Sequence, residues 1–138
     1  MEQPTTFDWP VRVYYEDTDA AGVVYYANYL RFLERARTEW MRHLGWEQQK
    51  MREELGMIFV VASINAQYRK PAKLDDKLIV RCHVKEIRKA SLMFIQDVFR
   101  EDELLLHSEV RCGSLNVETM KPKVMPDLLL NCLKQYID

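Results

Sequence analysis

The sequence predicts an α+β fold in which one long helix lies on a curved antiparallel sheet. Residues 28–44 carry a long helical repeat of apolar side chains, and the apolar stripe is wide. Four later segments, between residues 57 and 117, alternate apolar and polar side chains and are separated by short polar turns. Because no second long helix is predicted, a sheet is needed to cover the apolar face of the first.

Length and composition indicate one domain over residues 1–138. The 20 basic and 21 acidic residues give a net charge of −1, which argues against a general nucleic-acid-binding protein. Cys82, Cys112 and Cys132 are widely spaced and form no Cys-x-x-Cys pair, so neither a zinc ribbon nor a disulfide scaffold is expected. The first residues contain no apolar signal segment, and we expect a cytoplasmic protein.

The first strand is predicted over residues 9–15, where apolar and polar residues alternate. An acidic loop with Asp17 and Asp19 follows it and turns at Gly22. One interpretation of this loop is a solvated turn, because Asp and Thr side chains bond readily to nearby backbone. An EF-hand calcium site is excluded, since its bidentate Glu would fall on Asn28. A lone Asp-x-Asp is weak evidence for magnesium, so no metal site is predicted.

The long helix is predicted over residues 28–44, with Gly45 as the residue that ends it. Asn28 stands where an N-cap residue belongs, ahead of the first apolar position. A carboxylate held beside such a helix start is chemically useful, because the first turn offers unpaired N–H groups and a partial positive charge. The apolar stripe comprises Tyr29, Leu33, Ala36, Trp40 and Leu44, flanked by Leu30, Arg37 and Met41.

The rest of the chain reads as a short helix, a meander of strands and a final helix. The short helix is predicted within residues 46–55, where Gly56 stops it. The final helix is predicted over residues 128–136, capped by Asp127 after a connector rich in proline. The four strands are predicted over residues 57–68, 77–87, 91–100 and 104–117. In the second of these strands, Leu78, Val80, Cys82 and Val84 are expected to face inward.

The acidic loop belongs to a longer pattern that starts at Tyr15, Tyr-x-Asp-Thr-Asp-x-x-Gly-Val-Val-Tyr-x-Ala-Asn-Tyr, followed by Phe-Leu-Glu-Arg-Ala-Arg-Thr-Glu. The pattern resembles the hotdog-fold acyl-CoA thioesterases of the 4-hydroxybenzoyl-CoA thioesterase family, and among them the Tol–Pal-associated type. The similarity continues through residues 68–72, 75–76, 88–91 and 121–122, so it covers most of the chain. It implies a hotdog fold, in which a curved antiparallel sheet of about five strands wraps one helix, assembled as a homodimer or homotetramer.

The resemblance also implies hydrolysis of acyl-CoA thioesters to the free acid and CoA, without a separate cofactor. The catalytic aspartate of the family falls on Asp19, and the helix start at Tyr26, Ala27 and Asn28 resembles its oxyanion-binding element. An ionised aspartate acts on a thioester either as a nucleophile or as a base that activates water, and both roles stay open. Asp17, in contrast, is expected to serve the backbone of its own loop.

A basic turn places Arg88 and Lys89 just before Ser91. Two adjacent cations in a hairpin are commonly solvated, but the resemblance implies that Arg88 and Lys89 contact the phosphates of CoA and that Ser91 adds a polar contact. Many relatives of this type carry histidine where this chain has Tyr26, so a titratable group is missing from the site. We expect Tyr26 to pack at the site and not to act as an acid or base.

Two rival functions remain. A hotdog hydratase or dehydratase usually needs a histidine near the helix start, and none lies between Asp19 and Arg42. A non-catalytic module that binds acyl-CoA or acyl carrier protein for a cell-envelope complex is a different class. Asp19 argues against it, because a pure binder has no use for a carboxylate beside a thioester. The expected partners are acyl-CoA and, as a second substrate form, acyl carrier protein; the sequence leaves the choice between them and the acyl chain length open.

Overall fold

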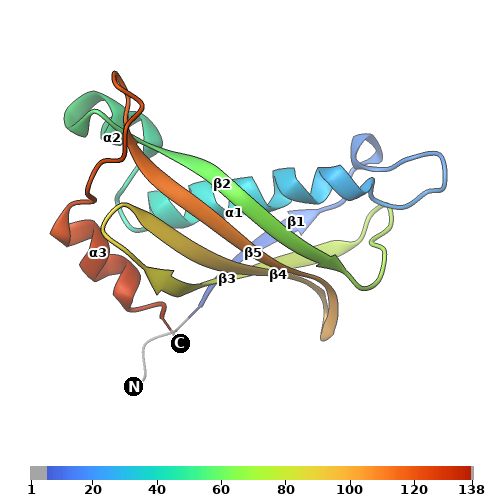
Figure 1. The fold of residues 1–138 in the computed structure, drawn as a ribbon. Helices are drawn as coiled ribbons and strands as arrows, with labels where there is room; N and C mark the ends of the chain where they lie inside the picture. Colours follow the sequence, from blue (N-terminus) through green and yellow to red (C-terminus); the bar gives the residue numbers. More distant parts are fainter. Residues whose placement is uncertain (1–5, 138) are drawn as a thin grey trace.

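Five strands form one antiparallel sheet that wraps around a long helix in the computed structural model, which describes residues 6–137 (Figure 1). The strands lie in the order β1-β3-β4-β5-β2. They are β1 (Phe7–Arg12), β2 (Met57–Tyr68), β3 (Lys77–Ile87), β4 (Ser91–Arg100) and β5 (Glu103–Asn116). The helices are α1 (Tyr29–His43), α2 (Gln48–Leu55) and α3 (Asp127–Lys134). The predicted α+β fold, one long helix on a curved antiparallel sheet, is confirmed.

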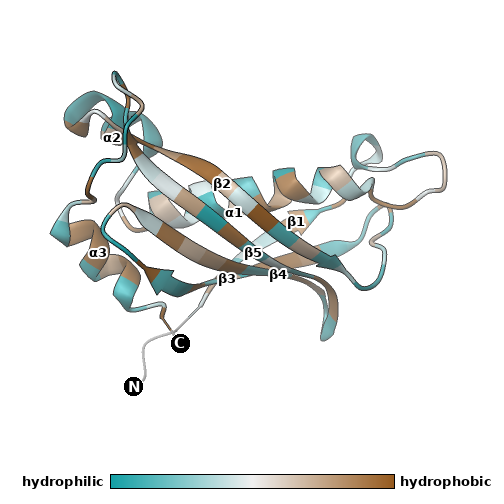
Figure 2. Cartoon of the chain, in the orientation of Figure 1, coloured by the Kyte–Doolittle hydropathy of each residue, from teal (hydrophilic) through white to brown (hydrophobic). Residues whose placement is uncertain are grey.

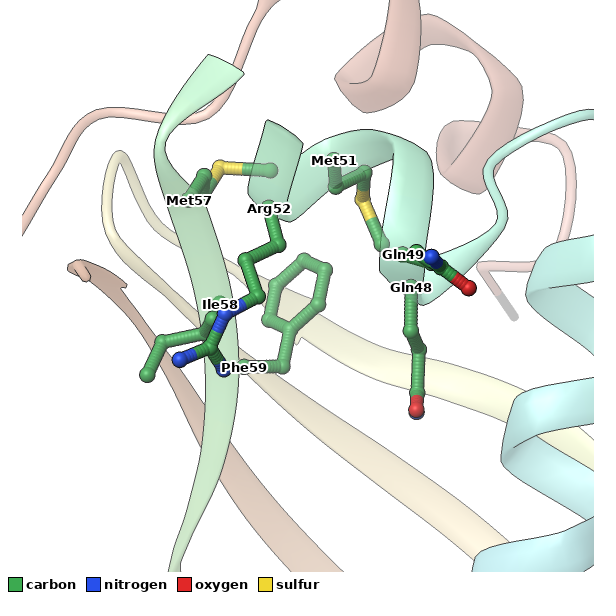
Figure 3. Close-up of a pocket in the computed structure, with 7 residues that line it drawn as sticks. All are labelled: Gln48, Gln49, Met51, Arg52, Met57, Ile58 and Phe59. Atoms are coloured by element: carbon green, nitrogen blue, oxygen red, sulfur yellow. The ribbon is translucent and has the colours of Figure 1, made fainter. Parts of the chain in front are cut away.

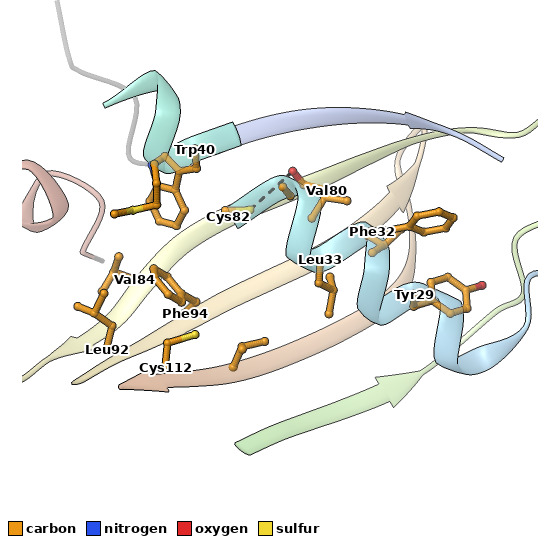
Figure 4. Packing of buried hydrophobic residues seen from close by; sticks show 14 of the residues in the cluster. Tyr29, Phe32, Leu33, Trp40, Val80, Cys82, Val84, Leu92, Phe94 and Cys112 are labelled. Atoms are coloured by element: carbon orange, nitrogen blue, oxygen red, sulfur yellow. Dashed lines mark hydrogen bonds between the residues drawn. The ribbon is translucent and has the colours of Figure 1, made fainter. Parts of the chain in front are cut away.

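Helix α1 buries one broad face against the sheet, and Figure 4 shows its side chains lying between the helix and the strands. Each fully buried large apolar side chain stabilises the fold by roughly 1.5–3 kcal/mol. The predicted stripe omitted Phe32, which is fully buried, and placed Leu30 beside the core, although Leu30 is exposed. The buried residues of α1 are Tyr29, Phe32, Leu33, Ala36, Trp40 and Met41.

The inward face of β3 is as predicted, because Leu78, Val80, Cys82 and Val84 are all buried. The predicted end of the first strand is wrong: β1 covers Phe7–Arg12 and not residues 9–15. Arg12 pairs with Lys77, the first residue of β3. Val13 then exchanges backbone hydrogen bonds with Asp75 and Asp76 in the turn before β3, where the ladder ends. The length of β1 is therefore set by the strand beside it. The last strand, β5, is displaced from its predicted bounds by one residue at each end.

Two glycines follow helices as predicted, and a proline precedes the third helix. Gly45 follows α1 with φ +89°, and Gly56 follows α2 with φ +62°, a left-handed backbone that glycine adopts at little cost. Helix α3 begins one residue earlier than predicted, at Asp127, so Pro126 and not Asp127 precedes its first turn. Asp127 makes no side-chain cap there but places a negative charge in the first turn, which favours the helix.

The two edges of the sheet differ in character. Strand β1 carries Asp8, Pro10 and Arg12, and charges and proline are devices that protect an edge from further pairing. The twelve residues of β2 include no charged side chain, and Met57 to Val61 are all apolar (Figure 2). A β-bulge at Ala62 interrupts its alternation. The β2 edge thus lacks the charges and proline that would protect it from pairing with another strand.

A buried polar contact fixes α1 against the sheet. Gln96 of β4 is fully buried; its amide donates to the carbonyl of Leu33 at 2.9 Å and accepts from the guanidinium of Arg37 at 2.7 Å. Burial lowers the pKa of Arg37, and burial raises the pKa of the neighbouring Cys82 thiol to about 12. Because a buried amide is costly to leave unpaired, this contact sets the rotation of α1 and thereby the direction of its first turn.

Candidate active site

The acidic loop holds Asp19 at its exposed tip. The backbone N–H of Asp19 donates to the carbonyl of Val23, and that of Gly22 donates to the carbonyl of Asp19, both at 2.9 Å. Gly22 has φ +80°, which suits glycine at this turn. The N–H of Ala21 donates to Asp19 Oδ1 at 2.9 Å, while none of the described residues donates to Oδ2. The carboxylate is therefore oriented by its own loop, with one oxygen available to a substrate.

The helix begins beside this loop as a short 3₁₀ turn, Tyr26–Asn28, that runs directly into α1. Its first hydrogen bond goes from the N–H of Asn28 to the carbonyl of Tyr25, at 2.8 Å. The N–H groups of Tyr26 and Ala27 precede that bond, and no acceptor for either lies among the described residues. Unpaired N–H groups at a helix start attract negative charge. Two such donors are what the predicted oxyanion-binding element would need.

Asp19 and the helix start border the same hollow, of about 290 Å³. The hollow brings together the predicted residues Asp19, Ala27 and Asn28; Tyr26 lies beside it at the first helical position. Two further charged residues were not predicted here, Glu16 and Arg31. The side chains that line it are Glu16, Asp17, Thr18, Asp19, Tyr25, Ala27, Asn28 and Arg31.

Asn28 stands at the predicted N-cap position, directly before α1, but its side chain does not cap the helix. Its backbone is already helical, with φ −70° and ψ −23°, and its side chain makes no capping bond. Instead, its Nδ2 donates to Asp17 Oδ1 at 2.9 Å, and Asp17 Oδ2 accepts from the N–H of Tyr14 at 2.8 Å. Asp17 thus serves its own loop, as expected, and also holds the helix start, which sequence reasoning missed.

Four tyrosines lie at the start of the helix. The ring of Tyr26 is 62% exposed and lies 4.8 Å from that of Tyr25 and 6.3 Å from that of Tyr68, between ring centroids. Tyr29, by contrast, is buried; its hydroxyl accepts from the N–H of Ala72 at 3.0 Å, and burial raises its pKa. The ring of Tyr26 therefore packs at the rim of the site.

The basic turn lies at the opposite end of the sheet, beside α3 (Figure 1). The carbonyl of Lys89 accepts from the N–H of Met125, Arg88 is paired with Glu86 at 2.5 Å, and the hydroxyl of Ser91 lies 3.5 Å from Arg111. Strand β3 joins the two ends of the sheet, and its 11 residues make it roughly 30 Å long. One chain therefore does not bring this turn to Asp19.

A larger hollow, of about 390 Å³, lies between α2 and the first residues of β2 (Figure 3). Its lining is mixed: Met51, Met57, Ile58 and Phe59 are apolar, and Gln48, Gln49 and Arg52 are polar. It contains none of the predicted site residues. Within residues 6–137, no cluster of three His, Cys, Asp or Glu side chains is placed to bind a metal ion. No helix in this range has the length and apolar character that a membrane span requires.

Residues 13–133 match the family model described as the thioesterase-like superfamily. The chain belongs to this superfamily. It is 46% identical to the acyl-CoA thioesterase YbgC of Haemophilus influenzae over 120 residues, which are 87% of this chain and 88% of that protein. It is 44% identical to the acyl-CoA thioester hydrolase YbgC of Escherichia coli O157:H7, over 95% of this chain and 98% of that one.

Solved thioesterase structures share the fold of this thioesterase-like chain. A probable thioesterase from Bartonella henselae superposes with a TM-score of 0.84 at 30% identity, covering 88% of this chain and 99% of that one. A 1,4-dihydroxy-2-naphthoyl-CoA thioesterase from Synechocystis reaches a TM-score of 0.86 at 19% identity, covering 94% and 96%, which shows the fold alone. The hotdog fold implied by the resemblance is confirmed, and the matched span includes both Asp19 and the basic turn.

Proposed function

We propose that the protein hydrolyses acyl-CoA thioesters to the free acid and CoA. Its relatives in Haemophilus influenzae and Escherichia coli, similar over nearly their whole length, carry this activity in their names. The observation on which the proposal rests is the shared hollow of Asp19 and the helix start. It pairs an exposed carboxylate with unpaired N–H donors, the two kinds of group that thioester hydrolysis requires.

In the proposed mechanism, the N–H groups of Tyr26 and Ala27 donate to the carbonyl oxygen of the thioester. As that oxygen gains negative charge, a donor of this kind stabilises the transition state by about 3 kcal/mol. Asp19 then acts in one of two ways. Either its carboxylate attacks the carbonyl carbon and expels the CoA thiolate, leaving a mixed anhydride that water opens, or it takes a proton from the water that attacks.

A second copy completes the site in this proposal. The uncharged β2 edge pairs with the β2 edge of another chain around a two-fold axis, which makes a homodimer the minimum unit and a homotetramer a pair of such dimers. Antiparallel pairing places the Met57 end of one β2 beside the Tyr68 end of the other. The Arg88–Lys89 turn lies at the Met57 end of its own sheet, so it serves the Asp19 of the other copy.

The basic turn then holds the phosphates of CoA, with Arg88 and Lys89 as cations and Ser91 as a polar contact. Three further predictions come from the sequence alone. They are a role for acyl carrier protein as a second thiol carrier, a cytoplasmic location and a link to a Tol–Pal envelope complex. The non-catalytic binding module is not favoured, because a binder gains nothing from placing the exposed Asp19 next to N–H donors.

The test measures thiol release, with a disulfide reagent, from a panel of acyl-CoAs. Their acyl groups differ in chain length and in aromatic character. Asp19→Asn keeps the shape of the side chain but can neither attack the thioester nor accept a proton. We expect it to lower kcat by about 10² or more. Glu16→Gln, a change to an exposed carboxylate in the same hollow, is the matched control and should keep nearly full turnover. Absence of thiol release by the folded protein, or wild-type turnover by Asp19→Asn, would overturn the proposal.

A further inference from the structure

The Asp17–Asn28 pair joins the acidic loop to the start of the helix through two buried side chains. Asp17 is 6% exposed and Asn28 is 7% exposed, and a 2.9 Å hydrogen bond links them across eleven residues of sequence. We propose that this pair sets the separation between the carboxylate of Asp19 and the N–H groups of the first helical turn. The inference rests on the proposed function and makes Asp17 and Asn28 positioning residues for that reaction.

The placement of the pair in the chain carries the argument. Asp17 lies two residues before Asp19, and Asn28 lies two residues after Tyr26. Only two residues of backbone therefore separate each side chain of the pair from a reacting group, so a shift of the side chain would also shift that group. Misplacement of a reacting group by about 1 Å can lower a rate about 10²-fold, so a connection this short controls the chemistry.

Backbone contacts bind the same two segments and give the pair a fixed frame. The N–H of Tyr25 donates to the carbonyl of Asp17 at 3.1 Å, and Thr18 pairs with Val24 in an isolated β-bridge. The N–H of Val24 in turn donates to the carbonyl of Ala72 at 2.9 Å, which ties the loop to the segment ahead of β3. Backbone contacts thus hold the two arms of the loop together, and the Asp17–Asn28 bond connects the loop to the helix start.

The chemistry of the pair explains why it is strong. Both carboxylate oxygens of Asp17 are satisfied, one by Asn28 and the other by the N–H of Tyr14 at 2.8 Å. A hydrogen bond to an ionised acceptor is about twice as strong as a neutral one. Loss of either donor leaves a carboxylate oxygen of the 6% exposed Asp17 without a partner, which is costly for a buried charged group. The pair therefore resists being pulled apart when substrate enters the hollow.

A charge-swap series tests the proposal. Asn28→Asp places two carboxylates face to face at hydrogen-bond distance. Asp17→Asn leaves two amides, and a rotated Asn28 amide restores a weaker, neutral bond. The double variant, Asp17→Asn with Asn28→Asp, rebuilds an amide–carboxylate pair with the roles exchanged, and its carboxylate still lies at a helix start, where negative charge is favourable. The expected falls in kcat are about 100-fold for Asn28→Asp and about tenfold for Asp17→Asn, with KM within about threefold of wild type.

Rescue and melting temperature separate positioning from mere stability. We expect the double variant to recover kcat to within about threefold of wild type, a coupling that independent sites would not show. All rates are measured well below the melting temperature of each variant. Single variants that melt lower but turn over like wild type would overturn the proposal, as would a double variant with native melting temperature and no recovery of kcat. Failure of the proposed function is distinguishable, because then the wild-type protein itself releases no thiol.

Discussion

The hydroxyl of Tyr68, at the end of β2, donates a 3.0 Å hydrogen bond to the backbone carbonyl of Tyr26. This bond connects an edge strand of the sheet to the first turn of the helix at the candidate active site. Because Tyr26 is held through its carbonyl, the position of its N–H is tied to β2, the edge on which a second copy is expected. In the proposed homodimer, the contact between subunits and the geometry of the site would therefore be coupled through Tyr68.

The first prediction concerns the hydroxyl of Tyr26, which lies at the rim of the site. The side chain of Tyr26 raises the pKa of Tyr25, and the two rings lie 4.8 Å apart between centroids. Tyr26→Phe should keep kcat within about threefold of wild type, because tyrosine is a poor base near neutral pH. Tyr25→Phe is the matched control. A loss of a hundredfold or more in Tyr26→Phe alone would assign it acid–base catalysis.

The second prediction concerns the basic turn. Replacing Arg88 and Lys89 together by Ala should raise KM about tenfold and change kcat little, as expected when ground state and transition state lose the same contact. Arg81→Ala, a cation of the preceding strand β3 that is paired with Asp8, is the control. An unchanged KM would assign the two cations to a solvated turn.

Glu86 offers an independent check of that turn. Its hydrogen bonds to Arg88 and then to Arg111 lower the pKa of Glu86, so it is a charged competitor for any phosphate that binds there. Glu86→Gln removes this competitor and should lower KM for acyl-CoA, with the largest effect at low ionic strength. A raised KM would instead show that Glu86 orients Arg88 for the substrate.

The third prediction concerns the β2 edge. Val61 is 46% exposed on this strand, and Val61→Glu would place like charges near each other in a two-fold pair. Sedimentation at micromolar concentration should then show monomers with little activity. Leu128→Glu changes an apolar residue of α3 that is 72% exposed and should leave both assembly and turnover intact. An active monomer would contradict the composite site.

The fourth prediction concerns pH and stability. Burial alone would raise the pKa of Asp76, but the N–H of Lys73 and the guanidinium of Arg100, each at 2.8 Å, outweigh it and hold the pKa below its ordinary value. The stabilisation is therefore present at neutral pH and is lost as pH falls below about 4. Asp76→Asn should lower Tm at pH 7, and the difference from wild type should narrow in acid. Asp75→Asn, at the adjacent carboxylate, is the control; a constant difference would contradict the assignment.

The fold was largely predictable because its signals are local. The period of α1 and the alternation of β3 each lie within one segment of sequence. The end of β1 was not predictable, because it depends on where β3 begins to pair. The bulge at Ala62 was missed for a similar reason, since it appears only when β2 is laid against β5.

The site was predictable where a sequence motif carried it and unpredictable where side chains meet across the loop. Asp19 follows from the motif, and the structure places it in one hollow with the predicted helix start. Asn28 was assigned as a cap because Asn is common at that position. Its side chain instead donates to the buried carboxylate of Asp17, eleven residues earlier, and a hydrogen bond to a carboxylate is the stronger one. The one available signal was the presence of Asp17 and Asn28 in the same motif.

The separation of Asp19 from the basic turn, at opposite ends of β3, has a consequence for mixed assemblies. In a two-fold dimer of an Asp19→Asn chain with an Arg88→Ala/Lys89→Ala chain, one site carries both defects and the other carries none. Subunit exchange between the two variants should therefore give about a quarter of the wild-type sites, as random pairing of two chains requires. The gain is measured with acyl-CoA well below KM, where the Arg88/Lys89 variant itself turns over slowly. Complementation of this kind fails if each chain holds its own complete site.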